Sequence, residues 1–226
     1  MGGNAVTCRA DPPQIFTNGR AKMSPVIDGR RARGDRTREA ILAHAVDLAS
    51  CEGLESLSIG RLATGLGISK SGLFAHFGSK DDLQVEVIRA ARDVFAARVL
   101  VPALAAPAGV GRLEALCERW LAYSKDRVFA GGCFFAQAGA EFDARPGKVR
   151  NELAAAMGDW LTVLERSAAT LDGVGPDHAP QLAFELYALM EAANAMSLLR
   201  GDPSAYDRAR TGIHQRLAGY RRQAER

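Results

Sequence analysis

The chain has 226 residues, of which 47% are hydrophobic and 24% charged, as in an ordinary folded protein. This balance excludes a disordered chain, a collagen-like fibre and a disulfide-stapled scaffold. The net charge is only +3. Basic residues nevertheless outnumber acidic ones in residues 1–80, whereas the rest of the chain is close to neutral. The uneven distribution favours a nucleic-acid partner for the N-terminal part.

Residues 1–34 are rich in proline, glycine and arginine and show no periodic apolar face, which predicts a disordered basic leader. A helix is expected over residues 37–52, where apolar residues recur at helical spacing before Gly53. The arginines that precede and open this helix either lie along a DNA backbone or form a solvated tail. They are Arg30, Arg31, Arg33, Arg36 and Arg38.

Residues 57–77 predict two short helices joined by a glycine turn, which is the pattern of a helix-turn-helix. Ser58 can cap the first helix, and Gly67 supplies the positive φ that ends it. The second helix opens with Ser69, Lys70 and Ser71 and keeps its apolar residues toward its end. Its first turn is thus free to meet a phosphate or a base edge, and we interpret it as a DNA recognition helix.

The rest of the chain predicts helices alone, separated by glycine and proline, with no sustained period-two alternation. The fold class is therefore all-α. A three-helix DNA-binding module is expected over residues 35–82, followed by a six-helix domain over residues 83–226. The six expected helices cover residues 79–99 (ended by Pro102), 112–129, 133–142, 146–171, 176–200 and 203–222.

The segment from Ile59 to Leu83 contains Leu62-Ala63, Leu66-Gly67-Ile68-Ser69-Lys70 and Gly78-Ser79-Lys80-Asp81-Asp82. It resembles the signature of the tetracycline-repressor (TetR) family of bacterial regulators. A second block runs from Gly132-Cys133-Phe134-Phe135 to Arg145-Pro146-Gly147. This block is similar to a C-terminal domain found in one branch of that family.

The resemblance implies a homodimeric, sequence-specific transcriptional repressor. Its last two long helices would pair with those of the partner, and its middle helices would enclose a ligand pocket. The partners implied are double-stranded DNA carrying a palindromic operator and a small apolar or amphipathic inducer that releases the operator. No cofactor is implied.

The resemblance assigns DNA contacts residue by residue. The family more often has Tyr where Phe74 stands, so one expected phosphate contact is missing. Each assignment has a plainer alternative, because the serines can simply cap helices, the cations can be solvated, and the histidine can be packed. The candidates are Ser58, Arg61, Ser69, Lys70, Ser71, His76 and Lys80.

Residues 179–199 are apolar on nearly all sides of a helix, so they need cover from their own domain and from a second subunit. The alternative is an internal helix of one large core. A membrane span is disfavoured because Gln181, Glu185, Glu191 and Asn194 interrupt the segment. The candidate dimer residues are Leu182, Leu186, Leu189, Met190, Ala193 and Met196.

Aromatic residues concentrate in the second domain, where they either line an inducer cavity or belong to the core. Asn194, Gln137 and Glu141 can anchor a ligand or be satisfied internally. Cys133, at an expected helix start, is either a reactive thiol or a buried inert one. The candidate pocket residues are Trp120, Tyr123, Phe134, Phe135, Trp160, Phe184 and Tyr187.

Catalytic patterns are missing from the sequence. There is no H-E-x-x-H, no G-x-S-x-G, no clustered metal ligands and no C-x-x-C pair, and we expect neither an enzyme nor a metal site. The N-terminus lacks the apolar run of a secretory signal. The four cysteines are scattered along the chain, from which we expect a cytoplasmic protein with reduced thiols. Two rival functions remain, namely an all-α ligand carrier or enzyme with an architectural helix-turn-helix, and a nucleoid-type structural protein without sequence preference.

Overall fold

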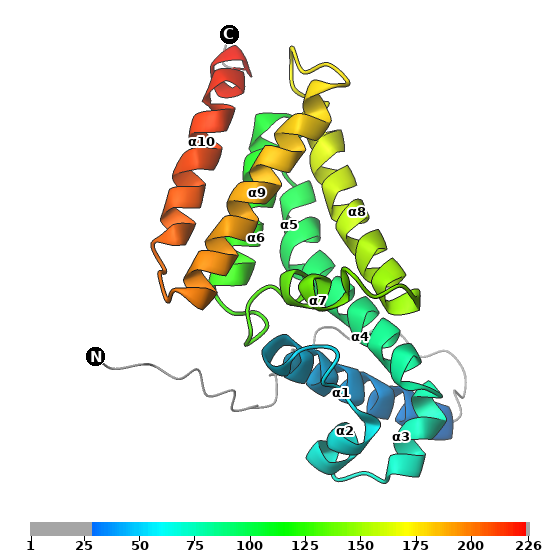
Figure 1. The fold of residues 1–226 in the computed structure, drawn as a ribbon. Helices are drawn as coiled ribbons and strands as arrows, with labels where there is room; N and C mark the ends of the chain where they lie inside the picture. Colours follow the sequence, from blue (N-terminus) through cyan, green and yellow to red (C-terminus); the bar gives the residue numbers. More distant parts are fainter. Residues whose placement is uncertain (1–28, 225–226) are drawn as a thin grey trace.

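The computed structural model describes residues 29–224, and the regular structure in this range is entirely helical (Figure 1). The expected all-α class is confirmed. The elements are α1 (Gly29–Glu52), α2 (Ile59–Leu66), α3 (Lys70–Phe77), α4 (Lys80–Phe95), the π-helix η1 (Ala96–Leu100), α5 (Val101–Leu104), α6 (Val110–Lys125), α7 (Phe134–Phe142), α8 (Lys148–Ala168), α9 (His178–Leu199) and α10 (Ala205–Ala224).

The first three helices form a small module at one end of the molecule, and α4 leads from it into the larger bundle (Figure 1). The predicted helix ends are confirmed. The Ser58 hydroxyl accepts a hydrogen bond from the Arg61 N–H at 3.2 Å, and Gly67 ends α2 with a φ of +65°. Leu62 and Leu73 are fully buried and hold α2 and α3 against the module's core.

The predicted leader over residues 1–34 is corrected in part, because α1 already begins at Gly29. Residues 1–28 lie outside the described range. The early part of α1 is tied to the rest of the module through Arg38. Its guanidinium donates to the His76 carbonyl at 2.7 Å, pairs with Glu86 at 2.5 Å and lies over the Phe77 ring. This half-buried arginine of the basic run is therefore bound by other parts of the protein.

The helix expected to end at Pro102 continues past it, which is a second correction. After α4 the backbone widens into η1, where the Val101 N–H bonds the Ala96 carbonyl five residues back. Proline has no N–H to continue a regular α-helical ladder, and a π-turn before it allows the helix to proceed into α5. One nearly continuous helical rod therefore runs from Lys80 to Leu104.

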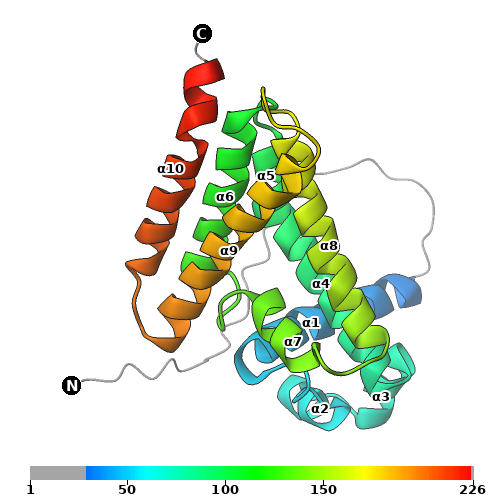
Figure 2. The ribbon, with the colours of Figure 1, turned by 45° about the horizontal axis from the view of Figure 1, so that its top comes forward.

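The C-terminal bundle is built around α9, which packs against α8, α10 and α6 (Figures 1 and 2). A buried polar cluster ties three of these helices together. The Asn194 side-chain oxygen accepts hydrogen bonds from the Ser124 hydroxyl at 2.8 Å and from the Cys133 N–H at 3.2 Å. Tyr206 on α10 completes the cluster at 2.9 Å from Ser124. Asn194 is thus an internally satisfied group.

By length and composition α9 could cross a membrane, and within residues 29–224 it is the one helix that could. Its burial pattern matches a core helix, because Leu182, Leu186, Met190 and Ala193 are at most 2% exposed within the chain itself. This corrects the expected dimer surface, since fully buried side chains offer no area to a partner. Of the six candidates, Leu189 and Met196 keep partial exposure.

The opposite side of α9 carries an exposed apolar stripe. Phe184 is 62% exposed and Leu199 is 90% exposed at its two ends. Between them lie exposed alanines at helical spacing, namely Ala188, Ala192 and Ala195. Exposed large apolar side chains in one row mark a surface suited to protein association.

Candidate nucleic-acid interface and effector cavity

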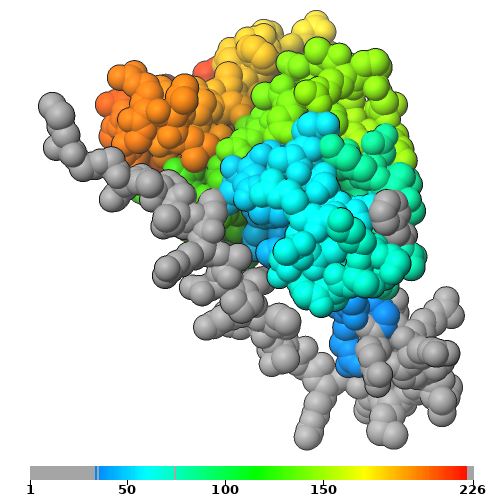
Figure 3. All heavy atoms as spheres, turned by 60° about the horizontal axis from the view of Figure 1, so that its bottom comes forward, coloured from blue at the N-terminus to red at the C-terminus, as the bar shows by residue number. Residues whose placement is uncertain are grey.

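The first turn of α3 is exposed at the tip of the molecule. The Ser69 hydroxyl caps the helix by accepting from the Gly72 N–H at 3.1 Å. Ser69, Lys70 and Ser71 are all exposed, whereas Leu73 and Phe77 are buried on the inner side. Figure 3 shows α2 and α3 on the surface at this end. A helix start with exposed N–H groups and hydroxyls suits a phosphate or a base edge.

The three candidate cations differ in their partners. Lys70 forms no ion pair with any side chain that the structure describes, and its own side chain lies beside Gly60 of α2. Arg61 is paired with Glu52. Lys80 donates to the Glu55 carbonyl at 2.7 Å and pairs with the Glu55 carboxylate at 3.0 Å, which lowers the pKa of that carboxyl. These pairs are exposed, so exchanging them for DNA phosphates costs little.

The two remaining candidates are half-buried. Ser58 uses its hydroxyl as the helix cap already described. His76 lies at the far end of α3, where it borders a polar recess that also includes Glu86 of α4 and Lys148 of α8. The structure therefore brings Ser69, Lys70 and Ser71 together and leaves His76 away from this cluster.

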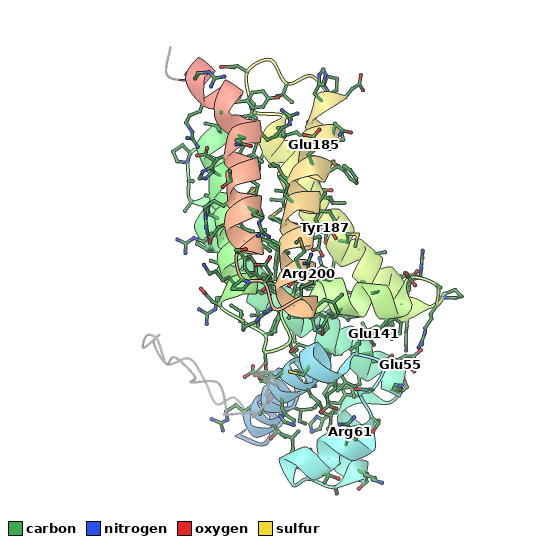
Figure 4. All side chains as sticks on the ribbon, turned by 60° about the vertical axis from the view of Figure 1, so that its left-hand side comes forward. Glu55, Arg61, Glu141, Glu185, Tyr187 and Arg200 are labelled. Carbon is green, nitrogen blue, oxygen red and sulfur yellow. The ribbon has the colours of Figure 1, made fainter. Side chains whose placement is uncertain are left out.

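A second connection joins the module to the bundle, and sequence reasoning missed it. The Glu141 carboxylate on α7 accepts the N–H groups of Leu54 at 3.1 Å and Glu55 at 2.8 Å, just beyond the end of α1 (Figure 4). In the segment that precedes α7, the Gly131 N–H donates to the hydroxyl of Ser50 on α1 at 3.2 Å. We call these contacts the α1–α7 junction. Capture of backbone N–H groups by a distant carboxylate leaves no periodic signal in a sequence.

A cavity of about 550 Å³ lies within the bundle between α4, α6, α8 and α9. Four of the expected pocket residues line it, namely Trp120, Phe135, Trp160 and Tyr187. Phe134 and Tyr123 are buried but do not line it. Phe184 does not line it either, because it lies on the exposed side of α9. Helical spacing alone did not separate the inner from the outer face of a helix that is apolar all round.

The cavity also contains groups that the aromatic pattern did not predict. Phe95 stands at the centre of its aromatic wall, with ring centroids 5.3 Å from Trp160 and 5.9 Å from Phe135, in edge-to-face contact. Glu191, one turn after Tyr187, also lines the cavity, and burial raises the pKa of its carboxyl to about 7. Burial raises the pKa of Cys133 to about 12, which makes it an inert thiol.

Charged residues from α4 and α8 form the exposed edge of the cavity. Arg89 pairs with Glu152 at 3.3 Å and with Glu86 at 2.9 Å, and Arg92 pairs with Glu152 and Asp159. These ion pairs connect α4, which begins at the DNA-binding module, to α8 on the opposite wall of the cavity. Within residues 29–224 no cluster of three His, Cys, Asp or Glu side chains could hold a metal ion.

Two family models match the chain. One describes bacterial regulatory proteins of the tetR family and matches residues 41–87, and the other describes the tetracyclin repressor-like C-terminal domain and matches residues 109–213. No curated protein matches the chain in sequence.

Solved structures share the fold. A TetR transcriptional regulator from Chloroflexus aurantiacus is 22% identical with a TM-score of 0.75, the match covering 83% of this chain and 96% of that one. A TetR-family regulator from Streptomyces coelicolor is 24% identical with a TM-score of 0.71 and the same coverage. AibR, solved in complex with isovaleryl coenzyme A and operator DNA, is 19% identical with a TM-score of 0.64, covering 78% and 95%.

Proposed function

Because the chain belongs to the TetR family of bacterial transcriptional regulators, we propose that it is a homodimeric repressor that leaves a palindromic operator when a small molecule fills its cavity. The observation that carries the proposal is one helical rod, from Lys80 to Leu104, that begins directly after the exposed helix α3 and lines the cavity further along its length. The exposed start of α3 lies before Lys80, and Phe95 and Leu100 of the same rod line the cavity. TetR-family regulators are generally not enzymes, and we propose no catalytic role.

In the proposed complex the first turn of α3 enters the major groove. Ser69, Lys70 and Ser71 reach base edges or phosphates there, because they are exposed. Arg61 and Lys80 contact the backbone after giving up their exposed carboxylate partners. Ser58 and His76 lie at the edge of this interface. AibR, which has the same fold, was solved with operator DNA.

The proposed dimer forms through the outer side of α9 together with α10. The exposed Phe184 and Leu199 would be covered by the same surface of a second copy, and the small alanines between them allow close helix approach. Two recognition helices related by a two-fold axis reach successive major grooves about 34–36 Å apart. A palindromic operator follows from that symmetry.

Ligand binding is proposed to reach α3 by two connections. The first is α4 with η1, since π-helical turns are local irregularities that can shift between hydrogen-bond patterns. The second is the α1–α7 junction, because Phe135 of α7 lines the cavity and Glu141 of the same helix holds the end of α1. Release requires the ligand to bind the operator-incompetent form more tightly, and a hundredfold preference supplies about 2.7 kcal/mol.

The test is selection of bound duplexes from a pool of random DNA, combined with the mass of the protein in solution. We expect enrichment of one inverted-repeat sequence and the mass of a dimer. Binding without any enriched sequence would favour a nucleoid-type protein. The absence of salt-dependent duplex binding would favour a ligand carrier, and either result would contradict the proposal.

A further inference from the structure

The cavity contains an unpaired carboxyl group. Glu191 lies on the inner side of α9, and no residue from 29 to 224 donates a hydrogen bond to it or forms an ion pair with it. The cause of its raised pKa is desolvation alone. A half-buried, desolvated carboxyl that has no partner inside its own protein is costly, and such a group is usually retained for a ligand or a reaction.

Aromatic rings surround the same space. Trp120, Phe135, Trp160 and Tyr187 line the cavity together with Phe95. The rings of Phe95 and Trp160 meet at an interplanar angle of 82°, so their π faces point in different directions. The face of an aromatic ring attracts a cation, and this attraction strengthens when the site excludes water.

The remaining charges at the cavity do not supply a counter-ion for Glu191. Its positive groups, Arg89 and Arg92, are already paired with Glu152 and Asp159 of α8. With Asp93 and Glu191 included, carboxyl groups outnumber guanidinium groups around the cavity four to two. The field inside the cavity therefore favours a positively charged ligand.

We propose that the cavity binds an amphiphilic organic cation, with its charged nitrogen beside Glu191 and its apolar part against Phe95, Trp120, Phe135 and Trp160. The cation replaces the partner that Glu191 lacks and gains cation–π attraction from the rings. Tyr187, one turn before Glu191 on α9, borders the same site. The inference rests on the proposed effector role of this cavity and names the ligand class that the role requires.

An anionic ligand is the contrasting possibility, since Arg89 and Arg92 border the cavity. An anion would have to displace carboxylates from both arginines and would also leave the desolvated Glu191 carboxyl without a partner. A cation leaves the ion pairs between α4 and α8 intact. The structure therefore favours the cation, and the anion becomes an outcome of the test.

The probes are three small molecules of similar shape. Benzyltrimethylammonium carries the positive charge, neopentylbenzene is its neutral carbon isostere, and phenylacetate is the anion. Binding to the full-length protein without DNA is measured by calorimetry and by the fluorescence of Trp120 and Trp160, which line the cavity. At pH 8 we expect the cation to bind at least tenfold more tightly than either of the other two.

The pH response provides an independent readout. The titratable and charged groups that line the cavity with Glu191 come from four places: Cys133 before α7, Tyr187 on α9, Arg89, Arg92 and Asp93 on α4, and Glu152 and Asp159 on α8. Tyr123 on α6 is buried behind this lining and interacts electrostatically with Glu191. Of these and Glu191, the carboxyl of Glu191 is the one whose pKa is raised to about 7. We therefore expect cation affinity to fall about tenfold from pH 8 to pH 6, and that of the neutral probe to stay unchanged.

Glu191→Gln removes the charge while keeping the size of the side chain. It should remove the pH response and weaken cation binding at least tenfold at pH 8, leaving only the attraction of the rings. The neutral probe should still bind, which also shows that the variant is folded. Glu165→Gln on α8, a carboxyl outside the cavity lining, is the matched control and should behave like the parent. Equal binding of cation and isostere, tighter binding of phenylacetate, or cation affinity that is unchanged in Glu191→Gln would each overturn the proposal.

Failure here is separable from failure of the proposed function. The binding assay contains no DNA, so a cavity that rejects cations leaves the repressor role intact. If the cation binds as expected but never alters operator affinity, the ligand class stands and the proposed release mechanism is refuted.

Discussion

Lys70 differs from the other two candidate cations because it has no carboxylate partner in the described part of the protein. It is exposed at the start of α3 and forms no ion pair with any residue that the structure describes, whereas Arg61 and Lys80 each hold a carboxylate. A cation without an internal partner can bind DNA without first losing a contact. Its position at the first turn of the proposed recognition helix also places it nearest to base edges.

Lys70→Ala is expected to change sequence preference as well as affinity. Loss of a base contact costs about 1–3 kcal/mol and relaxes selection at one operator position. Selection from random duplexes measures both effects. Arg166→Ala, which removes an exposed cation from the last turn of α8, should leave selection and affinity unchanged. Unaltered selection by Lys70→Ala would remove Lys70 from the recognition surface.

Lys80→Ala is expected to weaken binding to all duplexes alike. A lysine that meets a phosphate carries no base information, and its loss flattens the dependence of log K on log salt by about one. Titrations with operator and random duplexes at several salt concentrations provide the measurement. A shift in base preference would instead place Lys80 in the groove.

Glu191 makes the stability of the protein depend on pH in an unusual direction. Its folded pKa of about 7 lies above the ordinary glutamate value of 4.5, so the folded chain holds this proton more tightly than the unfolded chain does. The stabilising contribution of the protonated group is present below pH 4.5 and is lost as the pH rises through 7. Most paired carboxylates act in the opposite sense.

We therefore expect Glu191→Gln to raise the free energy of unfolding at alkaline pH. The gain is about 3 kcal/mol at pH 8 and about 1 kcal/mol or less at pH 5, because the Gln variant has no carboxyl to ionise. Denaturant unfolding at both pH values measures the difference, with Glu165→Gln as the reference. A difference that does not grow with pH would show that Glu191 is ionised at low cost in the folded state.

The α1–α7 junction depends on how closely two elements approach. A Cβ built on Gly131 would lie 1.5 Å from the Ser50 carbonyl oxygen, which belongs to the backbone of α1 and cannot rotate away. A Cβ at Gly139, inside α7, would have no neighbouring atom within 4 Å. Alanine at Gly131 therefore tests the close approach of the two elements, whereas alanine at Gly139 tests only the local helix preference.

Gly131→Ala should destabilise the protein by at least about 2 kcal/mol, because the junction must open to admit the methyl group. Gly139→Ala should stabilise it by about 0.5–1 kcal/mol, since alanine is the better helix former. Thermal and denaturant unfolding check both signs. Equal effects of the two substitutions would mean that α7 does not approach α1 as closely as described.

The outer surface of α9 is the part of the bundle that we expect to form the dimer interface. Its buried face is used by α6, α8 and α10, and the exposed apolar stripe is the part left for a second subunit. If that stripe is the dimer interface, its largest side chain, Phe184, should contribute strongly to association.

Phe184→Asp is expected to raise the dimer dissociation constant about 10- to 100-fold and to weaken operator binding accordingly, while helicity stays unchanged. Analytical ultracentrifugation and circular dichroism provide the two measurements. Val101→Asp is the matched control, because Val101 is also exposed, at 67%, but lies on α5. A dimer that survives Phe184→Asp and dissociates with Val101→Asp would relocate the interface.

Much of the architecture could be predicted from local patterns. The caps at Ser58 and Gly67, the exposed start of α3 and the succession of helices all depend on residues a few positions apart. Such short-range effects are written directly into a sequence, because helix caps and apolar periodicity act within one or two turns. The continuation past Pro102 was missed because a π-turn accommodates the proline within the helix. The early start of α1 at Gly29 was missed because the apolar periodicity begins only at Ile41.

The inner and outer faces of α9 could be assigned only by tertiary packing. A helix that is apolar all round gives no clue to which side its own domain covers, so Phe184 was expected in the pocket and Leu182 at a dimer surface. The unpaired Glu191 and the Glu141 contacts likewise depend on residues brought together from distant parts of the chain. Contacts of this kind follow from the three-dimensional arrangement of helices, which periodicity does not encode.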